Sequence, residues 1–345
     1  MSIHTPPALR ADNPVYARDA SSASISHSLR DAEYAELIQG LLAVPAQVAP
    51  KYLYDTLGSK LFEALCLLPE YYPTRTEASI VRAHLDDIAR VTGRNSTLID
   101  LGAGNCAKAE QLFDALAPTH YVAVDISADF LREAIDRLQA AHPDIAMMAL
   151  GQDFSQGLTL PATVPAENRL FFYPGSSLGN FAPEDARRFL SGLRQSGGDE
   201  ASLLLGVDLV KDAGVLNTAY DDHLGITSAF NLNLLRNLNQ ILGSDFDVRD
   251  WRHVAYFNKA ASRVEMYLQA QCAVDIHWNG AQRRFERGER IHTENSYKYT
   301  RESLSALLLK AGWQPTEFWT DPQKWFAVVH ARSDCTAPSP PEAAE

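Results

Sequence analysis

Two glycines and a distant aspartate form the segment of this sequence that is best suited to bind a ligand. A β-branched and apolar run at residues 97–101 ends in Gly102-Ala103-Gly104, and a second apolar run at 121–124 ends in Asp125. Glycines in such a turn adopt positive φ and let a ligand approach the backbone. An acid about 20 residues further on lies where its carboxylate binds both hydroxyls of a ribose. The pattern therefore predicts a cofactor that carries a nucleoside.

Alternating strands and helices place this turn at the carboxyl end of a strand in a sheet. After the turn we expect a helix over 106–116, then further strands over 145–150, 169–173 and 202–209. Strands that alternate with helices indicate an α/β fold with a doubly wound, mostly parallel sheet. Such sheets bind ligands at the carboxyl ends of their strands, which is where the turn lies.

The alternation breaks at residue 212. Residues 212–291 contain a helical stretch at 229–242 and two strand-like runs, in the first of which Val264, Met266 and Leu268 share one face. Asn279-Gly280 is a hairpin signal between the runs, so we expect a second domain inserted after the fifth strand. The sheet pattern resumes with a helix over 300–311, and runs at 317–320 and 325–330 predict a terminal antiparallel hairpin.

Composition excludes several classes of protein. The 345 residues are 46% hydrophobic and 21% charged, as in a soluble globular protein. A formal charge of −12 and a pI near 5.3 argue against a nucleic-acid partner. No apolar run is long enough to span a membrane, and the polar N-terminus lacks the apolar core of a secretory signal. The four cysteines and ten histidines are scattered without metal-ligand spacing, so we expect no metal and reduced thiols in a cytoplasmic protein.

A tyrosine-rich segment precedes the glycine turn. We expect helices over 31–42, 59–67 and 76–88, with Pro69 and Pro73 holding the chain in a non-helical path before the third. The tyrosines are Tyr52, Tyr54, Tyr71 and Tyr72. By itself this segment favours an ordinary helix–loop–helix whose tyrosines pack in the core.

The glycine turn alone does not choose between cofactors. Ala107 stands at the third position of the dinucleotide pattern, which tolerates it, so NAD and a dehydrogenase remain open. Asp100 ahead of the turn, Asp153-Phe154 after the third strand and the terminal hairpin resemble features of class I methyltransferases, which favours S-adenosylmethionine (SAM). Asp100 has an alternative role as a strand-end residue that caps backbone amides.

Several short stretches carry a more specific resemblance. They are Tyr-Leu-Tyr-Asp (52–55), Pro-Glu-Tyr-Tyr-Pro-Thr-Arg-Thr-Glu (69–77), Gly-Ser-Ser-Leu-Gly-Asn (175–180), Ala-Tyr-Asp-Asp (219–222), Phe-Asn-Leu-Asn (230–233), Val-Glu-Met (264–266) and Thr-Glu-Asn-Ser-Tyr-Lys-Tyr (293–299). Taken together they resemble the histidine-specific N-alpha-methyltransferases of ergothioneine biosynthesis. The similarity runs from about residue 31 to 332.

This resemblance implies an architecture and its boundaries. It implies a Rossmann-like class I methyltransferase domain, with a mostly parallel seven-stranded sheet that ends in an antiparallel hairpin, and a smaller α+β substrate domain. The implied methyltransferase domain is 76–211 with 297–333, and the substrate domain is 29–75 with 212–296. Residues 1–28 and 334–345 would be a flexible leader and tail.

The resemblance also implies which residues bind ligands. SAM would contact Gly102, Lys108, Asp125, Asp153 and Phe154, to which the turn itself adds Gly104. Histidine would contact Tyr54, Tyr71, Gly175, Asn180, Tyr220, Thr227, Met266, Glu294 and Ser296. From this set we expect Tyr54, Asn180 and Tyr220 to take part in catalysis.

Glu294 and Ser296 have the chemistry to recognise an imidazole. They are two residues apart, so on an extended segment both side chains point to one face. A neutral imidazole offers one N–H donor and one acceptor nitrogen, which a carboxylate and a hydroxyl can match. Without the resemblance, an exposed Glu and Ser on a strand edge would be the favoured interpretation. Met266 would add an adaptable apolar wall.

The expected reaction is direct methyl transfer to the α-amine of histidine, repeated to give mono-, di- and trimethylated products. No residue is assigned as the general base. The nearest alternative is the same fold acting on another aromatic amino acid or amine, and a further one is a sensor that binds both ligands without turnover. We expect small-molecule ligands and no obligate protein partner.

Overall fold

The computed structural model describes residues 22–126 and 128–333. The expected tail at 334–345 and most of the expected leader lie outside these residues. Within the leader, residues 22–28 belong to helix α1 (Ser22–Leu42), which therefore begins nine residues earlier than the expected start at 31. Among the described residues, no helix combines the length and apolar character needed to cross a bilayer.

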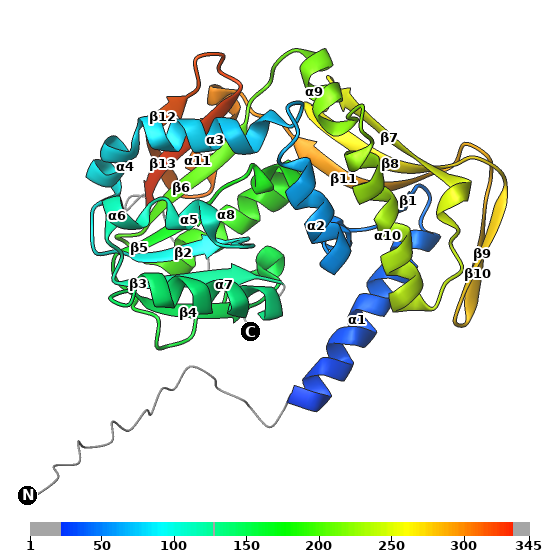
Figure 1. Cartoon of the computed structure of the whole chain (residues 1–345), viewed down its shortest axis with the longest axis horizontal. Coiled ribbons are helices and arrows are strands. Elements are labelled where there is room, and N and C mark those ends of the chain that lie inside the picture. The colour runs from blue at the N-terminus through cyan, green and yellow to red at the C-terminus, as the bar shows by residue number, and fades with distance from the viewer. Residues whose placement is uncertain (1–21, 127, 334–345) are drawn as a thin grey trace, which may run out of the picture.

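A seven-stranded sheet forms the larger part of the molecule (Figure 1). Its strand order is β12-β13-β6-β5-β2-β3-β4, and all neighbouring pairs are parallel except those of β13, which is antiparallel to β12 and β6. The expected parallel sheet with a terminal antiparallel hairpin is therefore confirmed. The strands are β2 (Thr97–Leu101), β3 (His120–Asp125), β4 (Ala146–Gly151), β5 (Arg169–Tyr173), β6 (Ser202–Asp208), β12 (Trp313–Thr320) and β13 (Phe326–Ser333).

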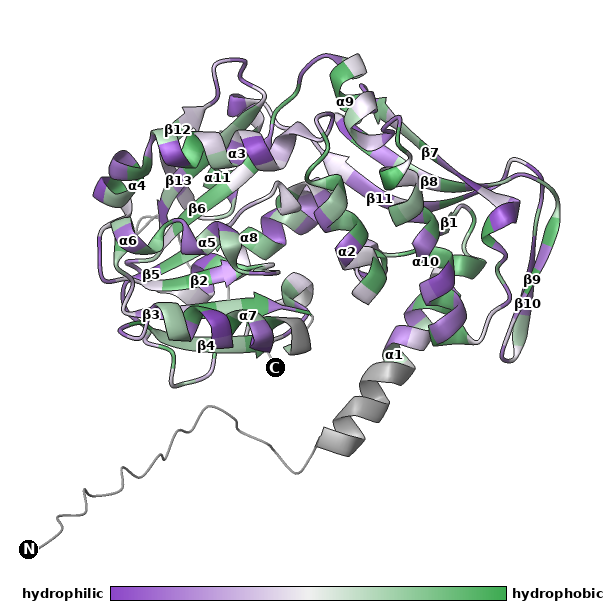
Figure 2. Ribbon diagram, viewed as in Figure 1, coloured by the Kyte–Doolittle hydropathy of each residue, from purple (hydrophilic) through white to green (hydrophobic). Residues whose placement is uncertain are grey.

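Helices cover both faces of this sheet, and an apolar core lies on each side. Figure 2 shows hydrophobic residues along its inner strands, with hydrophilic residues on the outward sides of the covering helices. The helices are α3 (Tyr72–Ala83), α4 (Leu85–Thr92), α5 (Ala107–Glu110), α6 (Phe113–Leu116), α7 (Ala128–Ala141), α8 (Pro183–Gly197) and α11 (Arg301–Lys310). Helix α11 lies where a helix was expected over 300–311, and Thr300 is its N-cap.

The helices expected to begin at 59 and 229 begin three residues earlier, at Thr56 and Ile226, and two further expected helices are divided in the structure. The third N-terminal helix begins at Tyr72 rather than 76, because Pro73 lies in its first turn, where the fixed φ of proline suits a helix. This helix ends at Ala83 with His84 as its C-cap, and α4 follows as a separate helix. The helix expected over 106–116 is divided into α5 and α6 by a tighter turn, in which the Leu112 N–H bonds the Ala109 carbonyl.

The smaller part of the molecule is a second sheet with its own helices, at the right of Figure 1. Its strand order is β1-β11-β8-β7, beside a β9–β10 hairpin. The strands are β1 (Ala46–Gln47), β7 (Trp251–Asn258), β8 (Arg263–Ala270), β9 (Val274–Trp278), β10 (Ala281–Phe285) and β11 (Arg290–Tyr297), and the α-helices are α1, α2 (Thr56–Leu65), α9 (Ala213–Tyr220) and α10 (Ile226–Leu242). Short 3₁₀ helices lie at Pro50–Leu53, Phe154–Gln156, Ser177–Asn180 and Val248–Asp250.

The sequence predicts fewer strands in this part of the chain than the structure has. It predicts two strands after the helix at 229–242, whereas the structure has five between β7 and β11. The turn at Asn279-Gly280 does join two antiparallel strands, but they are β9 and β10. The run at 264–270, which was expected on one side of this turn, is β8 and pairs with β7 and β11 instead. Val264, Met266 and Leu268 are all buried on one face of β8, which is also as expected.

The N-terminal segment and the insert share one apolar core, which combines residues between Leu37 and Tyr72 with residues between Leu216 and Ile291. The side-chain amide of Asn237 on α10 donates to the Tyr52 carbonyl at 2.8 Å, and that of Asn233 donates to Asp55 Oδ1 at 2.7 Å. Strand β1 pairs in parallel with β11. These contacts bring distant parts of the chain together; the exact domain boundaries stay a prediction.

Candidate functional site

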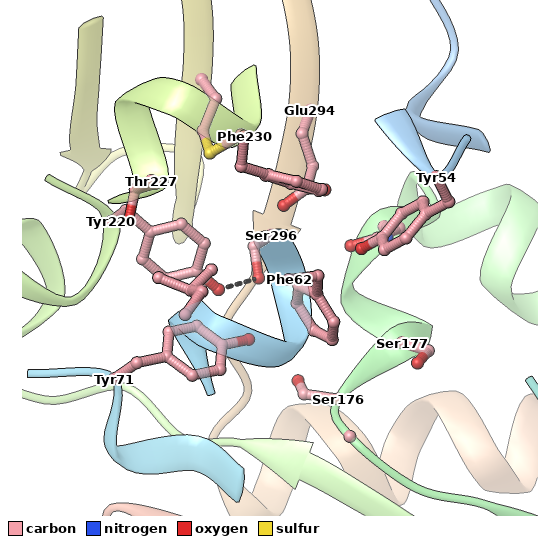
Figure 3. A pocket seen from close by; sticks show the side chains of 14 residues that line it. Tyr54, Phe62, Tyr71, Ser176, Ser177, Tyr220, Thr227, Phe230, Glu294 and Ser296 are labelled. Carbon is pink, nitrogen blue, oxygen red and sulfur yellow. Dashed lines mark hydrogen bonds between the residues drawn. The ribbon is translucent and has the colours of Figure 1, made fainter. Parts of the chain in front are cut away.

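A pocket lies between the carboxyl-end loops of the large sheet and the inner face of the small one (Figure 3). All nine residues expected at the histidine site line it. They are Tyr54, Tyr71, Gly175, Asn180, Tyr220, Thr227, Met266, Glu294 and Ser296. Five lining residues were not expected, namely Phe62, Leu65, Ser176, Ser177 and Phe230.

Strand β11 directs its two polar residues into the pocket. Glu294 and Ser296 are both buried and both line it, so the shared face expected from their spacing is confirmed. A register shift between His292 and Glu294 sets this orientation and places Glu294 opposite Met266 of β8. The small sheet therefore presents a carboxylate, a hydroxyl and a thioether to the same space.

Aromatic rings form the wall beside these groups (Figure 3). The Tyr54 ring contacts Phe62 edge-on, with ring centroids 5.5 Å apart, and Phe230 at 5.4 Å, while Tyr71 contacts Tyr220 at 6.2 Å. Burial raises the pKa of the Tyr54 and Tyr71 phenols well above the ordinary value, so both remain neutral. Phe62 could have been found from its helical spacing on the buried face of α2.

Two buried groups of the pocket have unusual surroundings. Burial raises the pKa of Glu294 to about 7, against the opposing charge of Lys298. The hydroxyl of Thr227 is buried without a hydrogen-bond partner, although the Thr227 backbone N–H donates to Asp222 Oδ1 at 2.7 Å. An unpartnered buried hydroxyl at the pocket wall indicates a place where a polar ligand atom binds.

A buried charge cluster lies directly behind the pocket. The Lys298 ammonium donates to Asp208 Oδ2 at 2.8 Å, to the Tyr220 hydroxyl at 2.9 Å and to Ser296 Oγ at 2.8 Å. Asp208 also accepts from Lys211 at 2.5 Å and from the Tyr72 hydroxyl at 2.8 Å. Burial alone would raise the pKa of Asp208, but the two ammonium groups hold it below its ordinary value. Sequence reasoning missed this cluster because its members are distant along the chain.

Glu77 of α3 links the pocket to the glycine turn. Its Oε1 accepts the Gly175 N–H at 2.8 Å, and its Oε2 accepts Lys108 Nζ at 2.8 Å. A Cβ at Gly206 of β6 would lie 1.9 Å from Oε1, so only glycine leaves room for this carboxylate. The sequence did single out Glu77, because this residue ends one of the stretches that carry the resemblance.

The glycine turn has the open backbone that its sequence predicts. Gly102 and Gly104 have φ of +73° and +53°, and no atom lies within 4 Å of a Cβ built on Gly104. The Gly104 N–H donates to Asp125 Oδ2 at 3.0 Å. Asp100 does not cap a backbone amide; its Oδ2 accepts from Tyr121 at 2.8 Å and its Oδ1 is buried without a partner. Burial raises the pKa of Asp100 to about 7.

The remaining residues expected to bind the cofactor surround this turn. The nearest atom to a Cβ on Gly102 would be Cζ of Phe154, at 3.9 Å. Asp153 accepts from the Ser155 N–H at 3.0 Å and from Lys51 Nζ at 3.3 Å, and these bonds lower its pKa although burial opposes them. Lys108 is ion-paired with Glu77, which places it between the turn and the pocket. Within residues 22–126 and 128–333, no group of three or more His, Cys, Asp and Glu side chains is arranged to hold a metal ion.

Comparisons with known proteins show which sequences and structures this chain resembles. The sequence model of a family described as histidine-specific, SAM-dependent methyltransferase matches residues 33–333. The histidine N-alpha-methyltransferase of Mycolicibacterium smegmatis is 39% identical over 296 residues, which are 84% of this chain and 91% of that protein. Ergothioneine biosynthesis protein 1 of Neurospora crassa is 31% identical over 290 residues, which are 80% of this chain and 32% of that longer protein. The solved CcbJ methyltransferase of Streptomyces caelestis aligns over 82% of this chain and all of its own, with 13% identity and a TM-score of 0.47.

Proposed function

The chain belongs to the family of histidine-specific, SAM-dependent methyltransferases, and we propose that it methylates the α-amino group of L-histidine. Three successive transfers would give N-alpha-trimethylhistidine (hercynine) for ergothioneine biosynthesis. The observation that carries this proposal is the buried pocket in which Glu294 and Ser296 lie side by side on β11.

The turn region fits SAM. Gly102 and Gly104 leave the backbone open, and the Phe154 ring lies beside Gly102. Asp125 suits the ribose hydroxyls, and the unpartnered oxygen of Asp100 suits a positively charged amine. When bound, SAM supplies an electrophilic methyl group on a sulfonium. The family match sets aside the NAD-dependent dehydrogenase as an alternative.

The pocket wall matches a neutral imidazole. Glu294 would accept the ring N–H, and Ser296 would hydrogen-bond the other ring nitrogen. An indole has no second ring nitrogen, so a tryptophan side chain would leave one of these buried groups unpaired. Sites of this kind reject such analogues by roughly 10⁴–10⁵-fold in favourable cases. This argues against the alternative of another aromatic substrate.

The other end of the substrate would face the loops of the large sheet. Asn180 follows β5, Gly175 exposes its backbone, and Thr227 has a hydroxyl free to bind. These groups suit the amine and carboxylate of an amino acid. Holding the amine in line with the methyl group can supply roughly 7–11 kcal/mol in well-oriented systems.

The α-amine must lose a proton before each of the three transfers, because a protonated amine has no lone pair with which to attack the methyl group. Tyr54 is partly buried and neutral at the pocket wall, so its phenol can accept a proton from the amine only while it passes its own proton to a water molecule. We therefore propose Tyr54 as a relay, with Asn180 and Tyr220 holding the substrate. The rings of Tyr54 and Tyr71 would also attract the growing quaternary ammonium by cation–π contacts of about 0.5–2 kcal/mol.

The proposed partners are small molecules, namely histidine and its mono- and dimethyl forms. A cytoplasmic location and the absence of a nucleic-acid partner stay proposals, the second supported by the formal charge of −12.

Incubating the protein with SAM and histidine, followed by mass spectrometry, tests the function. We expect products that carry one, two and three added methyl groups. Binding of both ligands without any methylated product would instead support the sensor, and this result would contradict the proposal.

A further inference from the structure

All three protons of the Lys298 ammonium are committed behind the pocket wall. The side chain is 0% exposed, and an ammonium has three donors and no acceptor. Its partners are Asp208 Oδ2, the Tyr220 hydroxyl and Ser296 Oγ, at 2.8–2.9 Å. Lys298 itself therefore has no proton left to give a ligand, and it acts only through the two hydroxyls that line the pocket.

The two hydroxyls also bond each other. Tyr220 donates to Ser296 Oγ at 2.7 Å (Figure 3). A phenol, with a pKa near 10, is more acidic than an aliphatic hydroxyl, so Tyr220 is the better donor of the pair. Ser296 Oγ then accepts two hydrogen bonds, one from Tyr220 and one from Lys298, which occupy both of its lone pairs. The proton of Ser296 is the hydroxyl hydrogen left to point into the pocket.

We propose that Lys298 is a positioning residue that makes Ser296 an obligate hydrogen-bond donor, so that the pocket binds only neutral imidazole, with its unprotonated nitrogen toward Ser296 and its N–H toward Glu294. This inference rests on the proposed function, because it takes histidine as the substrate. An imidazolium has two N–H donors and no acceptor, so its second N–H would face the Ser296 proton and the Lys298 charge.

The charges around Lys298 keep this arrangement in one state. Asp208 belongs to β6, Lys211 to the loop after it, Tyr72 to α3 and Tyr220 to α9. Glu294 is the carboxylate on the pocket side. Burial alone would lower the pKa of Lys298, but Asp208 raises it well above its ordinary value, so the ammonium stays charged. Burial lowers the pKa of Lys211 to about 8 against the same carboxylate. Lys298 therefore keeps its proton throughout the range where histidine titrates.

The competing interpretation is that Lys298 only neutralises Asp208. Lys211 separates the two roles, because it bonds the same carboxylate at 2.5 Å and the Tyr72 hydroxyl at 2.7 Å. Replacing either lysine with methionine removes one buried charge beside Asp208. Only Lys298→Met also releases Ser296 and Tyr220, so Lys211→Met is its matched control.

The test combines ring-¹⁵N NMR with affinity measurements on the full chain. Histidine labelled at both ring nitrogens is bound at pH 6, with S-adenosylhomocysteine present, and its ¹⁵N shifts report which nitrogens carry protons. In the wild type we expect one protonated and one unprotonated nitrogen, although a substantial fraction of free histidine is imidazolium at this pH. In Lys298→Met we expect the histidine dissociation constant to rise about 10- to 100-fold, with a smaller rise in Lys211→Met.

Each outcome bears on the proposal. Two protonated ring nitrogens in the wild-type complex would overturn it. An equal loss of histidine affinity in the two lysine variants would also overturn it. If Lys298→Met does not fold, Ser296→Ala replaces it; we expect weaker binding of histidine and a bound ring no longer held in one tautomer. A wild-type enzyme that forms no methylated histidine would contradict the proposed function instead, which is a separate result from any of these.

Discussion

The cofactor turn and the amino-acid pocket are built in different ways. The turn and the residues expected to bind the cofactor lie between Asp100 and Phe154, in one continuous stretch, and the turn offers mainly backbone. The pocket combines side chains from 54–71, 175–180, 220–230, 266 and 294–296. A generic cofactor is thus held by a local motif, whereas substrate choice depends on distant segments that meet only in the folded chain. Changes in each region should therefore affect different ligands.

Gly102→Val should have the largest effect and should act on the cofactor alone. Its positive φ makes any side chain unfavourable by about 1–2 kcal/mol, and the valine would extend toward Phe154, 3.9 Å from the Cβ position. We expect the affinity for S-adenosylhomocysteine to fall by roughly 100-fold or more, as measured by calorimetry. Gly93→Val is the control, because Gly93 has φ of +78° with open space around it at the other end of β2; unchanged affinity in both variants would refute the cofactor site.

Gly206→Ala should weaken both regions, because it acts on the carboxylate that joins them. The new Cβ would displace Glu77 Oε1, which lies 1.9 Å away, and so release the Gly175 N–H and disturb the pair with Lys108. We expect roughly tenfold weaker binding of both ligands. Gly192→Ala in α8, where a Cβ meets no atom within 4 Å, is the control. Loss of one ligand alone in Gly206→Ala would show that Glu77 does not join the two regions.

Glu294→Gln should affect histidine and spare the cofactor. The amide keeps the shape of the side chain but loses the charge-assisted bond to the imidazole N–H. We expect the KM for histidine to rise about tenfold at pH 8, with the affinity for S-adenosylhomocysteine unchanged. A variant with wild-type KM would exclude Glu294 from imidazole recognition.

The same variant should change stability with pH in a defined direction. Burial raises the Glu294 pKa from 4.5 to about 7 in the fold, so the folded protein binds the proton more tightly than the unfolded chain. Stability is therefore lost as pH rises from about 4.5 to about 7, and the loss is complete above that range. Without ligand, Glu294→Gln should melt at a higher temperature than the wild type at pH 8 and at nearly the same temperature at pH 4.5. An equal difference at both pH values would contradict the raised pKa.

Asp55→Ala should have the smallest effect on activity, because it removes structure next to the pocket rather than a ligand contact. Asp55 caps α2 by accepting the Gly58 N–H at 2.7 Å and also accepts from Asn233 at 2.7 Å. We expect the free energy of unfolding to fall by about 1–2 kcal/mol, with kcat/KM little changed under conditions where the protein stays folded. Thr300→Ala removes the cap of α11 and is the matched control. A large change in KM without a change in stability would place Asp55 in the site.

Local patterns were enough to predict the sheet, the glycine turn, the terminal hairpin and the shared face of Glu294 and Ser296. The start of α3 was missed because Pro73 was interpreted as a helix breaker, although a first turn tolerates it. The extra strands of the small sheet were missed because their polar, solvent-facing residues dilute the alternating pattern.

The pocket residues could be named in advance only through the resemblance, since neither spacing nor composition joins Tyr54 to Glu294. Lys298 shows most clearly which contacts a single sequence does not reveal. In the sequence it is one polar residue near the end of a strand, and only the fold brings it to Asp208, 90 positions earlier, and to Tyr220. Buried charge clusters of this kind depend on tertiary contacts that a single sequence does not display.

The most direct test of the central claim is a competition among amino acids. The protein is incubated with SAM carrying a labelled methyl group and an equimolar mixture of the standard amino acids, and all labelled products are identified by mass spectrometry. The account predicts that the label enters histidine and its methylated forms, and that Glu294→Gln slows this labelling. Label in tryptophan, tyrosine or another amino acid in preference to histidine would contradict it.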